Sequence, residues 1–121
     1  MKRILIILVM MMTITGIQAQ KISHIEATRS WYYVYDDNGK KVHTFSTTQG
    51  EVVAYSDSFY IVKHGSWYYT YDAKGKKLYT FSVSNVGEVL NAEGDTFTSR
   101  KGSWIYTWDK KGKKIATRSA H

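Results

Sequence analysis

One segment of this 121-residue sequence occurs three times. Residues 31–36 read Trp-Tyr-Tyr-Val-Tyr-Asp, and the segment recurs as Trp-Tyr-Tyr-Thr-Tyr-Asp at 67–72 and as Trp-Ile-Tyr-Thr-Trp-Asp at 104–109. The spacings are 36 and 37 residues, and each copy continues as Asp-x-x-Gly-Lys-Lys. Matches of this length do not arise by chance. The chain must therefore fold as successive copies of one small structural unit.

A second block repeats upstream of the first. Gly-Glu-Val occurs at 50–52 and again at 87–89, and the one extra residue of the later copy lies within 83–86. We expect a loop there, because an insertion is tolerated best in a surface loop. The first copy lacks this upstream half, which leaves about two and a half units. Their approximate bounds are 22–49, 50–86 and 87–121.

Each complete unit contains four short β-strand signals. In the second unit they lie at 51–55, 59–63, 67–71 and 77–81, and they are rich in Val, Ile, Thr, Tyr and Phe. A spacing of about 8 to 10 residues per strand leaves no room for a helix. The sequence predicts an all-β protein, an antiparallel meander of about two and a half four-stranded repeats.

The best turn signal is Asp-x-x-Gly. An aspartate at the first position accepts hydrogen bonds from the backbone amides that follow it, and a glycine at the fourth supplies the left-handed conformation of a bulged hairpin. We therefore predict three equivalent hairpin tips, at Asp36 and Gly39, Asp72 and Gly75, and Asp109 and Gly112.

The architecture leaves alternatives. Four strands in about 37 residues is the size of a propeller blade, but two and a half blades cannot close a ring that needs at least about four. We favour a continuous meander that twists or rolls over its own aromatic face. The other possibility is that copies of the chain associate and cover each other's ends. Lysines and arginines in 21–29 and 113–118 would protect open sheet edges.

The N-terminal segment is typical of an export signal. Lys2 and Arg3 precede an apolar run at 4–12, and a small residue, Ala19, ends the segment. A membrane anchor is the alternative, but the run is shorter than the roughly 20 apolar residues that span a bilayer. We predict that residues 1–19 are cleaved and that 20–121 form one domain in the periplasm or at the cell surface.

Composition excludes several kinds of chemistry. The chain has no cysteine, so it forms no disulfide and no thiolate metal site. It has 17 Lys and Arg against 10 Asp and Glu, a net charge of +7. Removal of Lys2 and Arg3 would leave +5, which suits an anionic polymer as partner. Export makes nucleic acid an unexpected partner.

No catalytic constellation is apparent. None of the four histidines lies in a recognisable catalytic context, and none stands at a metal-ligand spacing such as His-x-x-x-His. Glu51 and Glu88 recur after a glycine and could form a carboxylate site, although a solvated strand start is the stronger interpretation. We expect a protein that is not an enzyme and that holds no metal or cofactor.

The repeats resemble the WG (KWG) family, whose units end in a Lys-Trp-Gly-type strand followed by a turn rich in Lys and Gly. Residues 59–78 and 100–115 follow that shape. The hairpin half is also similar to the tyrosine-aspartate (YD) repeats of large bacterial surface proteins. This resemblance implies a β-repeat scaffold, often exported and usually of unassigned function, and it carries over no catalytic residue.

Two groups of side chains are candidates for binding. Period-two alternation places the tryptophans that open each repeated strand on one face, and we expect that face to pack as the core. Tyr32 and Tyr68 would then lie on the opposite face, with Ile105, as surface candidates that stack on sugars. The predicted packing residues are Trp31, Trp67 and Trp104.

A pair of lysines follows the turn glycine in every unit. In register, these pairs would form a basic ridge able to bind phosphate, sulfate or uronate groups, and a solvated, aggregation-resistant edge is the alternative. The pairs are Lys40 with Lys41, Lys76 with Lys77, and Lys113 with Lys114.

These features favour a non-enzymatic, exported β-repeat protein that binds or scaffolds at the cell envelope, with a glycan or an anionic polymer as candidate ligand. The alternative is a structural subunit that self-assembles into homo-oligomers through its sheet edges. An enzyme acting on a polysaccharide is a distant third.

Overall fold

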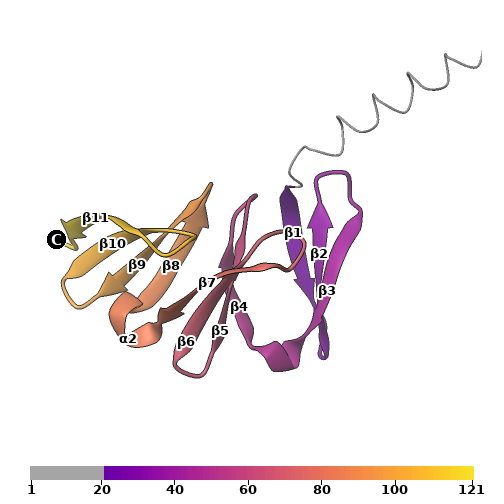
Figure 1. Cartoon of the computed structure of the whole chain (residues 1–121), viewed down its shortest axis with the longest axis horizontal. Coiled ribbons are helices and arrows are strands. Elements are labelled where there is room, and N and C mark those ends of the chain that lie inside the picture. Colours follow the sequence, from indigo (N-terminus) through magenta and orange to yellow (C-terminus); the bar gives the residue numbers. More distant parts are fainter. Residues whose placement is uncertain (1–20) are drawn as a thin grey trace, which may run out of the picture.

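The computed structural model describes residues 21–121, and the predicted export signal lies outside them. The described chain forms three antiparallel sheets in sequence order, and every strand pairs with the next one within its sheet (Figure 1). The predicted all-β meander is confirmed. Sheet 1 contains β1 (Ile22–Ala27), β2 (Trp31–Asp36) and β3 (Lys41–Ser46). Sheet 2 contains β4 (Glu51–Tyr55), β5 (Tyr60–His64), β6 (Trp67–Tyr71) and β7 (Lys77–Ser82). Sheet 3 contains β8 (Glu88–Glu93), β9 (Thr96–Lys101), β10 (Trp104–Asp109) and β11 (Lys114–Ser119).

The Asp-x-x-Gly turns form the predicted hairpin tips. In the second unit the amides of Lys74 and Lys76 donate to Oδ1 of Asp72 at 3.0 and 2.9 Å. The amide of Gly75 donates to the carbonyl of Asp72 at 3.0 Å, and its φ of +87° is the left-handed conformation that favours glycine. The same turn is built at Asp36 and Gly39, and at Asp109 and Gly112.

Two short helical turns connect the sheets. A 3-10 turn, η1 (Thr47–Gln49), joins sheets 1 and 2, and a one-turn helix, α2 (Val83–Val86), joins sheets 2 and 3. The expectation of a loop at 83–86 is wrong in this respect. The helical turn directs Val86 into the core, where it is fully buried, and burial of that side chain favours the turn over an irregular loop.

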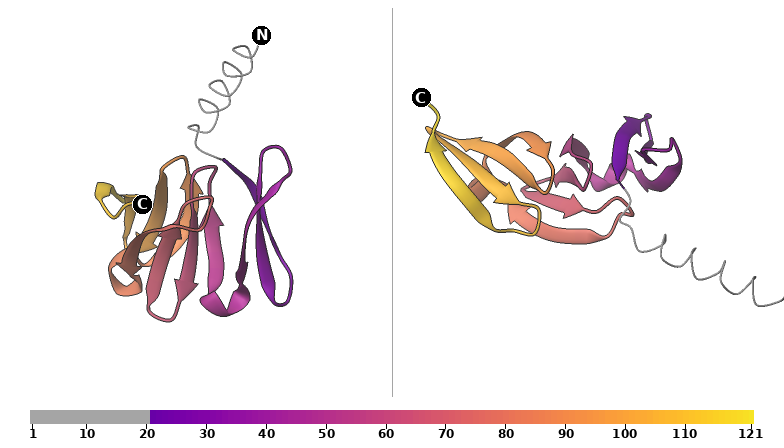
Figure 2. Two further views of the ribbon diagram at one scale, coloured as in Figure 1. Left: turned by 45° about the vertical axis from the view of Figure 1, so that its right-hand side comes forward. Right: turned by 90° about the horizontal axis from the view of Figure 1, so that it is seen from above.

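The sheets follow one another along the long axis of the molecule like consecutive propeller blades (Figure 2). The meander is divided into three sheets, because strand pairing stops at each helical turn. β4 and β8, the first strands of sheets 2 and 3, pack beside each other. In the described part of the chain, sheet 1 has three strands, and sheets 2 and 3 have four each.

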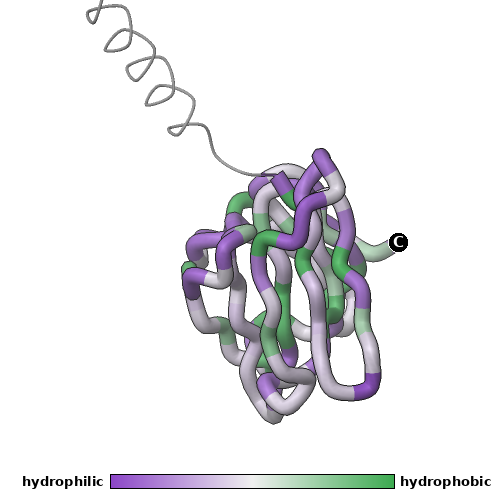
Figure 3. The backbone as a smooth tube through the Cα atoms, turned by 90° about the vertical axis from the view of Figure 1, so that its right-hand side faces the viewer, coloured by the Kyte–Doolittle hydropathy of each residue, from purple (hydrophilic) through white to green (hydrophobic). Residues whose placement is uncertain are grey.

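The core lies in two layers, one on each side of sheet 2. Tyr60 and Val62 of β5 face sheet 1, where they pack with Val34 and Phe45. Ile61 alternates to the other side and joins the layer against sheet 3. Sheet 2 is therefore covered on both faces. Hydrophobic positions lie along the strands, and several turns are hydrophilic (Figure 3).

The outer faces of the two end sheets carry polar side chains at positions that are apolar in sheet 2. On sheet 3, Arg118 stands where sheet 2 has the buried Phe81. On sheet 1, Glu26 stands where sheet 2 has the buried Val62. Terminal repeats with a polar outer face stop a stack of repeats. Other such exchanges are His24 for Tyr60 and Thr98 for Ile61.

We expect the buried phenol of Tyr60 to destabilise the fold at alkaline pH. Burial, with Tyr71 close by, raises its pKa above the ordinary value of 10. In the unfolded chain the phenol ionises near pH 10, so the stability that its neutral form contributes below that pH is lost as the pH rises, at up to about 1.4 kcal/mol per pH unit. Tyr60→Phe should lose less stability than the parent between about pH 9 and about pH 11 in urea unfolding.

Tyr55→Phe is the matched control for this measurement, because Tyr55 is 38% exposed. The Tyr60→Phe variant should fold normally at neutral pH, since Phe97 occupies the equivalent buried position in sheet 3. An alkaline loss that is the same in Tyr60→Phe as in the parent would contradict the assignment to Tyr60.

Candidate binding surface

Each sheet presents one tryptophan, one tyrosine and one lysine on the same face. Within a strand the tyrosine follows the tryptophan by two residues, so both side chains point to the same side. The lysine comes from the start of the next strand. We name these groups the Trp–Tyr–Lys clusters: Trp31, Tyr33 and Lys41; Trp67, Tyr69 and Lys77; Trp104, Tyr106 and Lys114.

In every cluster the lysine ammonium lies over the tyrosine ring. The distance from Nζ of Lys41 to the centroid of the Tyr33 ring is 4.2 Å, and the Lys114 to Tyr106 distance is also 4.2 Å. In sheet 2, Nζ of Lys77 is 5.3 Å from the ring of Tyr69. A cation over an aromatic face within about 6 Å is attracted by the electron density of the ring. This contact holds each lysine beside its tryptophan strand.

The expectation that the tryptophans pack in the core is wrong. Trp31 is 46% exposed, Trp67 is 48% exposed and Trp104 is 50% exposed. Each tryptophan is the first residue of its strand and stands at the end of its sheet, beside a turn. Residues further along the strand pack instead, as Trp108 shows at 8% exposure.

The expectation of a free surface is also wrong for Tyr68 and for Ile105, which is 9% exposed, whereas Tyr32 is partly buried. Tyr68 is 3% exposed, and its hydroxyl donates to the carbonyl of Gly87 at 2.7 Å. The hydroxyl of Tyr32 accepts from the amide of Val52 at 3.2 Å. Each tyrosine thus ties its sheet to the first strand of the next sheet, because the next sheet covers the face on which it lies. The ring of Tyr68 has no open face for a ligand.

The hairpin tips step along the molecule. A side chain added at Gly75 would meet the ring of His43 on β3, and one added at Gly112 would meet the ring of Tyr79 on β7. His43 and Tyr79 occupy equivalent positions of successive units. The tips of the second and third units therefore rest on the outer strand of the preceding sheet. The paired lysines beside the tips are all exposed: Lys40, Lys41, Lys76, Lys77, Lys113 and Lys114.

Lys110, at the tip of the third unit, has a structural contact instead. Its Nζ forms an ion pair with Asp95 at 3.0 Å. The hydroxyl of Ser58, from the turn between β4 and β5, donates to the same carboxylate at 2.7 Å. These hydrogen bonds lower the pKa of the Asp95 carboxyl. The group links sheet 2 to sheet 3 and is not available as part of a ligand surface.

Titratable residues are scattered. Between residues 21 and 121 no three His, Asp or Glu side chains come together in a way that could hold a metal ion. Glu51 and Glu88 are exposed at the starts of their strands. His24 lies on the polar end face, where it contacts Glu26 at 3.3 Å. The ring of His43 lies beneath the turn that contains Gly75, and burial there lowers its pKa.

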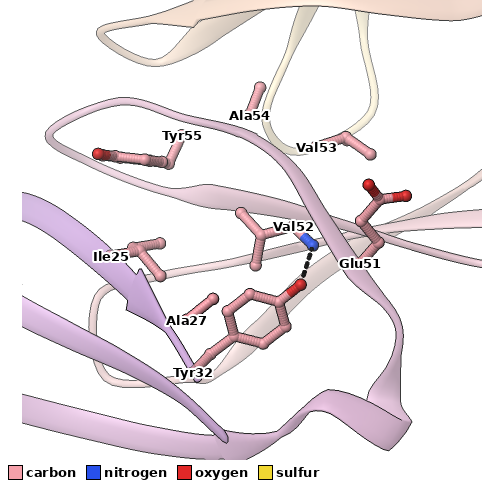
Figure 4. Close-up of a pocket in the computed structure, with 8 residues that line it drawn as sticks. All are labelled: Ile25, Ala27, Tyr32, Glu51, Val52, Val53, Ala54 and Tyr55. Atoms are coloured by element: carbon pink, nitrogen blue, oxygen red, sulfur yellow. Dashed lines mark hydrogen bonds between the residues drawn. The ribbon is translucent and has the colours of Figure 1, made fainter. Parts of the chain in front are cut away.

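A cavity of about 320 Å³ lies between β1 and β4 (Figure 4). Side chains from β1 and β2 form one wall, and consecutive residues of β4 form the other. Glu51 contributes the only carboxylate in this lining. The lining residues are Ile25, Ala27, Tyr32, Glu51, Val52, Val53, Ala54 and Tyr55.

Comparison with known proteins leaves this geometry as the main guide to function. No protein-family model matches the chain, and no curated protein matches it. The similarity to WG and YD repeats therefore stays a prediction. Within residues 21–121 no helix has the length and apolar character needed to cross a membrane.

Sequence reasoning missed the lysine–aromatic contact, although a signal for it was present. The second lysine of each pair follows the cluster tyrosine by the same interval, eight residues, in all three units. A fixed interval across a hairpin indicates a fixed cross-strand position. The contact could have been inferred from that interval together with the predicted turn.

Proposed function

We propose that this protein is a non-enzymatic, exported binding protein of the cell envelope, and that its Trp–Tyr–Lys clusters bind an anionic glycan. The observation that carries the proposal is that all three sheets hold the same cluster: a half-exposed tryptophan shares a strand face with a tyrosine, and a lysine ammonium lies 4.2 to 5.3 Å from that tyrosine ring. A packing role in the core would bury the tryptophans, so it does not explain why all three are half exposed.

The chemistry of the cluster suits a sugar polymer that carries carboxylate or sulfate groups. A tryptophan face stacks on the apolar face of a sugar ring, and a lysine attracts the acidic substituent of the same or the next ring. Repetition in three sheets would let a polymer gain affinity by engaging several weak sites at once. The predicted export signal and the excess of basic residues support this assignment.

Self-assembly through sheet edges is the second candidate. The outer strand β11 favours it, because all six of its residues are exposed and its outer edge pairs with no strand within residues 21–121. The polar end faces count against stacking of copies face to face. The repeated clusters have no role in edge pairing, so we place ligand binding first.

Binding to immobilised acidic and neutral polysaccharides tests the proposal. Trp67→Ala should weaken binding to the acidic polymer about tenfold, the effect of losing one aromatic contact worth about 1.4 kcal/mol. Lys77→Ala should reduce the dependence of binding on salt, because one screened charge contact is lost. Both variants should unfold at the temperature of the parent within a few degrees.

Tyr55→Ala is the matched control, because Tyr55 is an exposed aromatic residue of sheet 2, at 38%, outside the cluster. It should bind as the parent does. Light scattering on the same samples separates binding from self-assembly. Absence of binding to every polysaccharide, or an equal loss in Tyr55→Ala, would refute the proposal.

A further inference from the structure

Within residues 21–121, sheet 1 has no strand equivalent to the inner strand of the other two sheets. In sheets 2 and 3 the chain first lays down an inner strand, β4 or β8, and then pairs the next strand with it. β1 corresponds to that next strand, because Ile25 pairs with Val34 as Ile61 of β5 pairs with Thr70. Within residues 21–121, β2 is the only pairing partner of β1.

The backbone groups left free on β1 can be identified. The amide of Thr28 donates to the carbonyl of Trp31 at 2.8 Å, which marks a hydrogen-bonded pair at the end of the ladder. In an antiparallel ladder such pairs alternate with pairs whose backbone groups point away from the partner. The amides and carbonyls of Ala27 and Ile25 therefore face the open edge of sheet 1.

The equivalent groups in sheet 2 are paired. Lys63 and Ile61 of β5 stand where sheet 1 has Ala27 and Ile25, and they pair with Glu51 and Ala54 of β4. Ile61 is fully buried in this arrangement, whereas Ile25 is only partly buried. The open edge of sheet 1 thus lacks both the hydrogen bonds and the apolar cover that an inner strand provides.

The cavity between β1 and β4 occupies the place of the missing strand. Its lining includes Ile25 and Ala27 on one side and the length of β4 on the other (Figure 4). In the next sheet along, the corresponding place is filled by β4, which packs beside β8. The fold therefore holds an open slot with the edge of β1 as one wall and β4 as the other.

Contacts at both ends hold the walls of the slot in place. The amide of Ile22 donates to the carbonyl of Asp57 at 2.7 Å, and Tyr32 bonds to Val52 at 3.2 Å. The tyrosine link does not block a strand, because the equivalent Tyr68 makes its bond to Gly87 while β4 is in place. The slot is thus preformed, which lowers the entropic cost of binding.

The further inference rests on the proposed export of the protein. In sheets 2 and 3 the inner strand directly precedes the strand that pairs with it. Four residues separate the end of β4 from the start of β5. The residues at the corresponding place before β1 belong to the segment 1–19 that we predict is cleaved as the export signal. The mature chain would then have no strand of its own to place there.

We propose that the edge of β1 is an acceptor site for one extended peptide segment of another polypeptide, which adds antiparallel to β1 between sheets 1 and 2. Addition of a strand to an exposed edge uses backbone hydrogen bonds for affinity and side-chain pockets for specificity. The inner strands show which side chains suit this position. Both begin with Glu-Val, and their next residue is again apolar, Val53 in β4 and Leu90 in β8. The partner segment carries apolar residues at these positions.

Amide hydrogen exchange followed by NMR tests the site directly. The protein is the mature chain purified after export, with its N-terminus read by mass spectrometry, and the probe is a synthetic peptide with the sequence of residues 50–56. At saturating peptide the amides of Ile25 and Ala27 should exchange at least about tenfold more slowly. The amide of Glu26 already faces β2 and should not change. A peptide of the same composition in scrambled order is the control.

Ala27→Pro removes one donor from the open edge and none from the ladder with β2, a position where an edge strand tolerates proline. The variant should keep the unfolding temperature of the parent within a few degrees and bind the peptide at least about tenfold more weakly. If the variant unfolds early, N-methylation of the peptide at alternate residues removes the same bonds without altering the protein.

Several results would overturn the proposal. One is unchanged exchange at Ile25 and Ala27 with about 1 mM peptide, and another is equal affinity for the N-methylated peptide. Protection of both amides without peptide, in a sample that light scattering shows to be a dimer, would assign the edge to a second copy of the chain. The same protection in a monomer that retains residues 1–19 would assign the edge to the chain's own N-terminal segment.

Discussion

Gly87→Ala is expected to lower the free energy of unfolding by about 3 kcal/mol or more. The φ angle of Gly87 is +84°, a conformation that side chains disfavour. A Cβ atom at this position would also clash with the backbone carbonyl of Arg100 in the adjacent strand β9. Backbone atoms of a sheet cannot move aside without breaking the ladder, so both penalties apply together.

Gly94→Ala provides the matched control in the same sheet. The φ angle of Gly94 is +58°, but a Cβ added there would have no atom within 4 Å. Its cost should be only about 1 kcal/mol, the conformational penalty without the clash. Urea unfolding followed by tryptophan fluorescence measures both variants. Equal losses would show that the contact with Arg100 is relieved at no cost.

Phe97→Ala is expected to destabilise the fold by about 3 to 5 kcal/mol. Phe97 is 1% exposed, and its ring lies in the layer between sheets 2 and 3. The ring centroid is 5.2 Å from that of Phe81 in an edge-on contact and 6.4 Å from that of Trp108 in a stacked one. Truncation to alanine removes these ring contacts and leaves a cavity in the layer between sheets 2 and 3.

The same unfolding assay checks this prediction, with near-ultraviolet circular dichroism as a second signal for the environment of Trp108. Leu90→Ala is the control, since Leu90 is 46% exposed in the neighbouring strand β8. It should cost less than about 1 kcal/mol. A similar small cost for Phe97→Ala would mean that the layer between sheets 2 and 3 contributes little to stability.

The repeat made most of the backbone predictable. Strands alternate with Gly, Ser, Asp and Asn at every turn, and the Asp-x-x-Gly signal is local chemistry that needs no knowledge of the rest of the fold. The predicted strand at 67–71 coincides with β6, and the predicted strand at 59–63 is displaced from β5 by one residue. Local patterns therefore determined the hairpins.

The choice of buried face was not predictable in the same way. Alternation shows that Tyr68 and Trp67 point to opposite sides of β6, but it does not show where the neighbouring sheet lies. Tyrosine and tryptophan both have an apolar body and a polar tip, so composition does not decide between the faces. The position of the next inner strand decides it, since that strand meets the hydroxyl of Tyr68 through Gly87. The hydroxyl of Tyr32, which accepts from the amide of Val52, shows the same rule at the first junction.

The polar side chains on the two end faces determine how long a protein of this design can be. Only the middle unit has apolar residues on both faces, so it is the only one of the three that can be flanked on either side. A lineage of such chains could lengthen by duplicating residues 50–86. Duplication of the first or the last unit would bury Glu26 or Arg118 without a partner, a penalty that confines growth to the interior of the array.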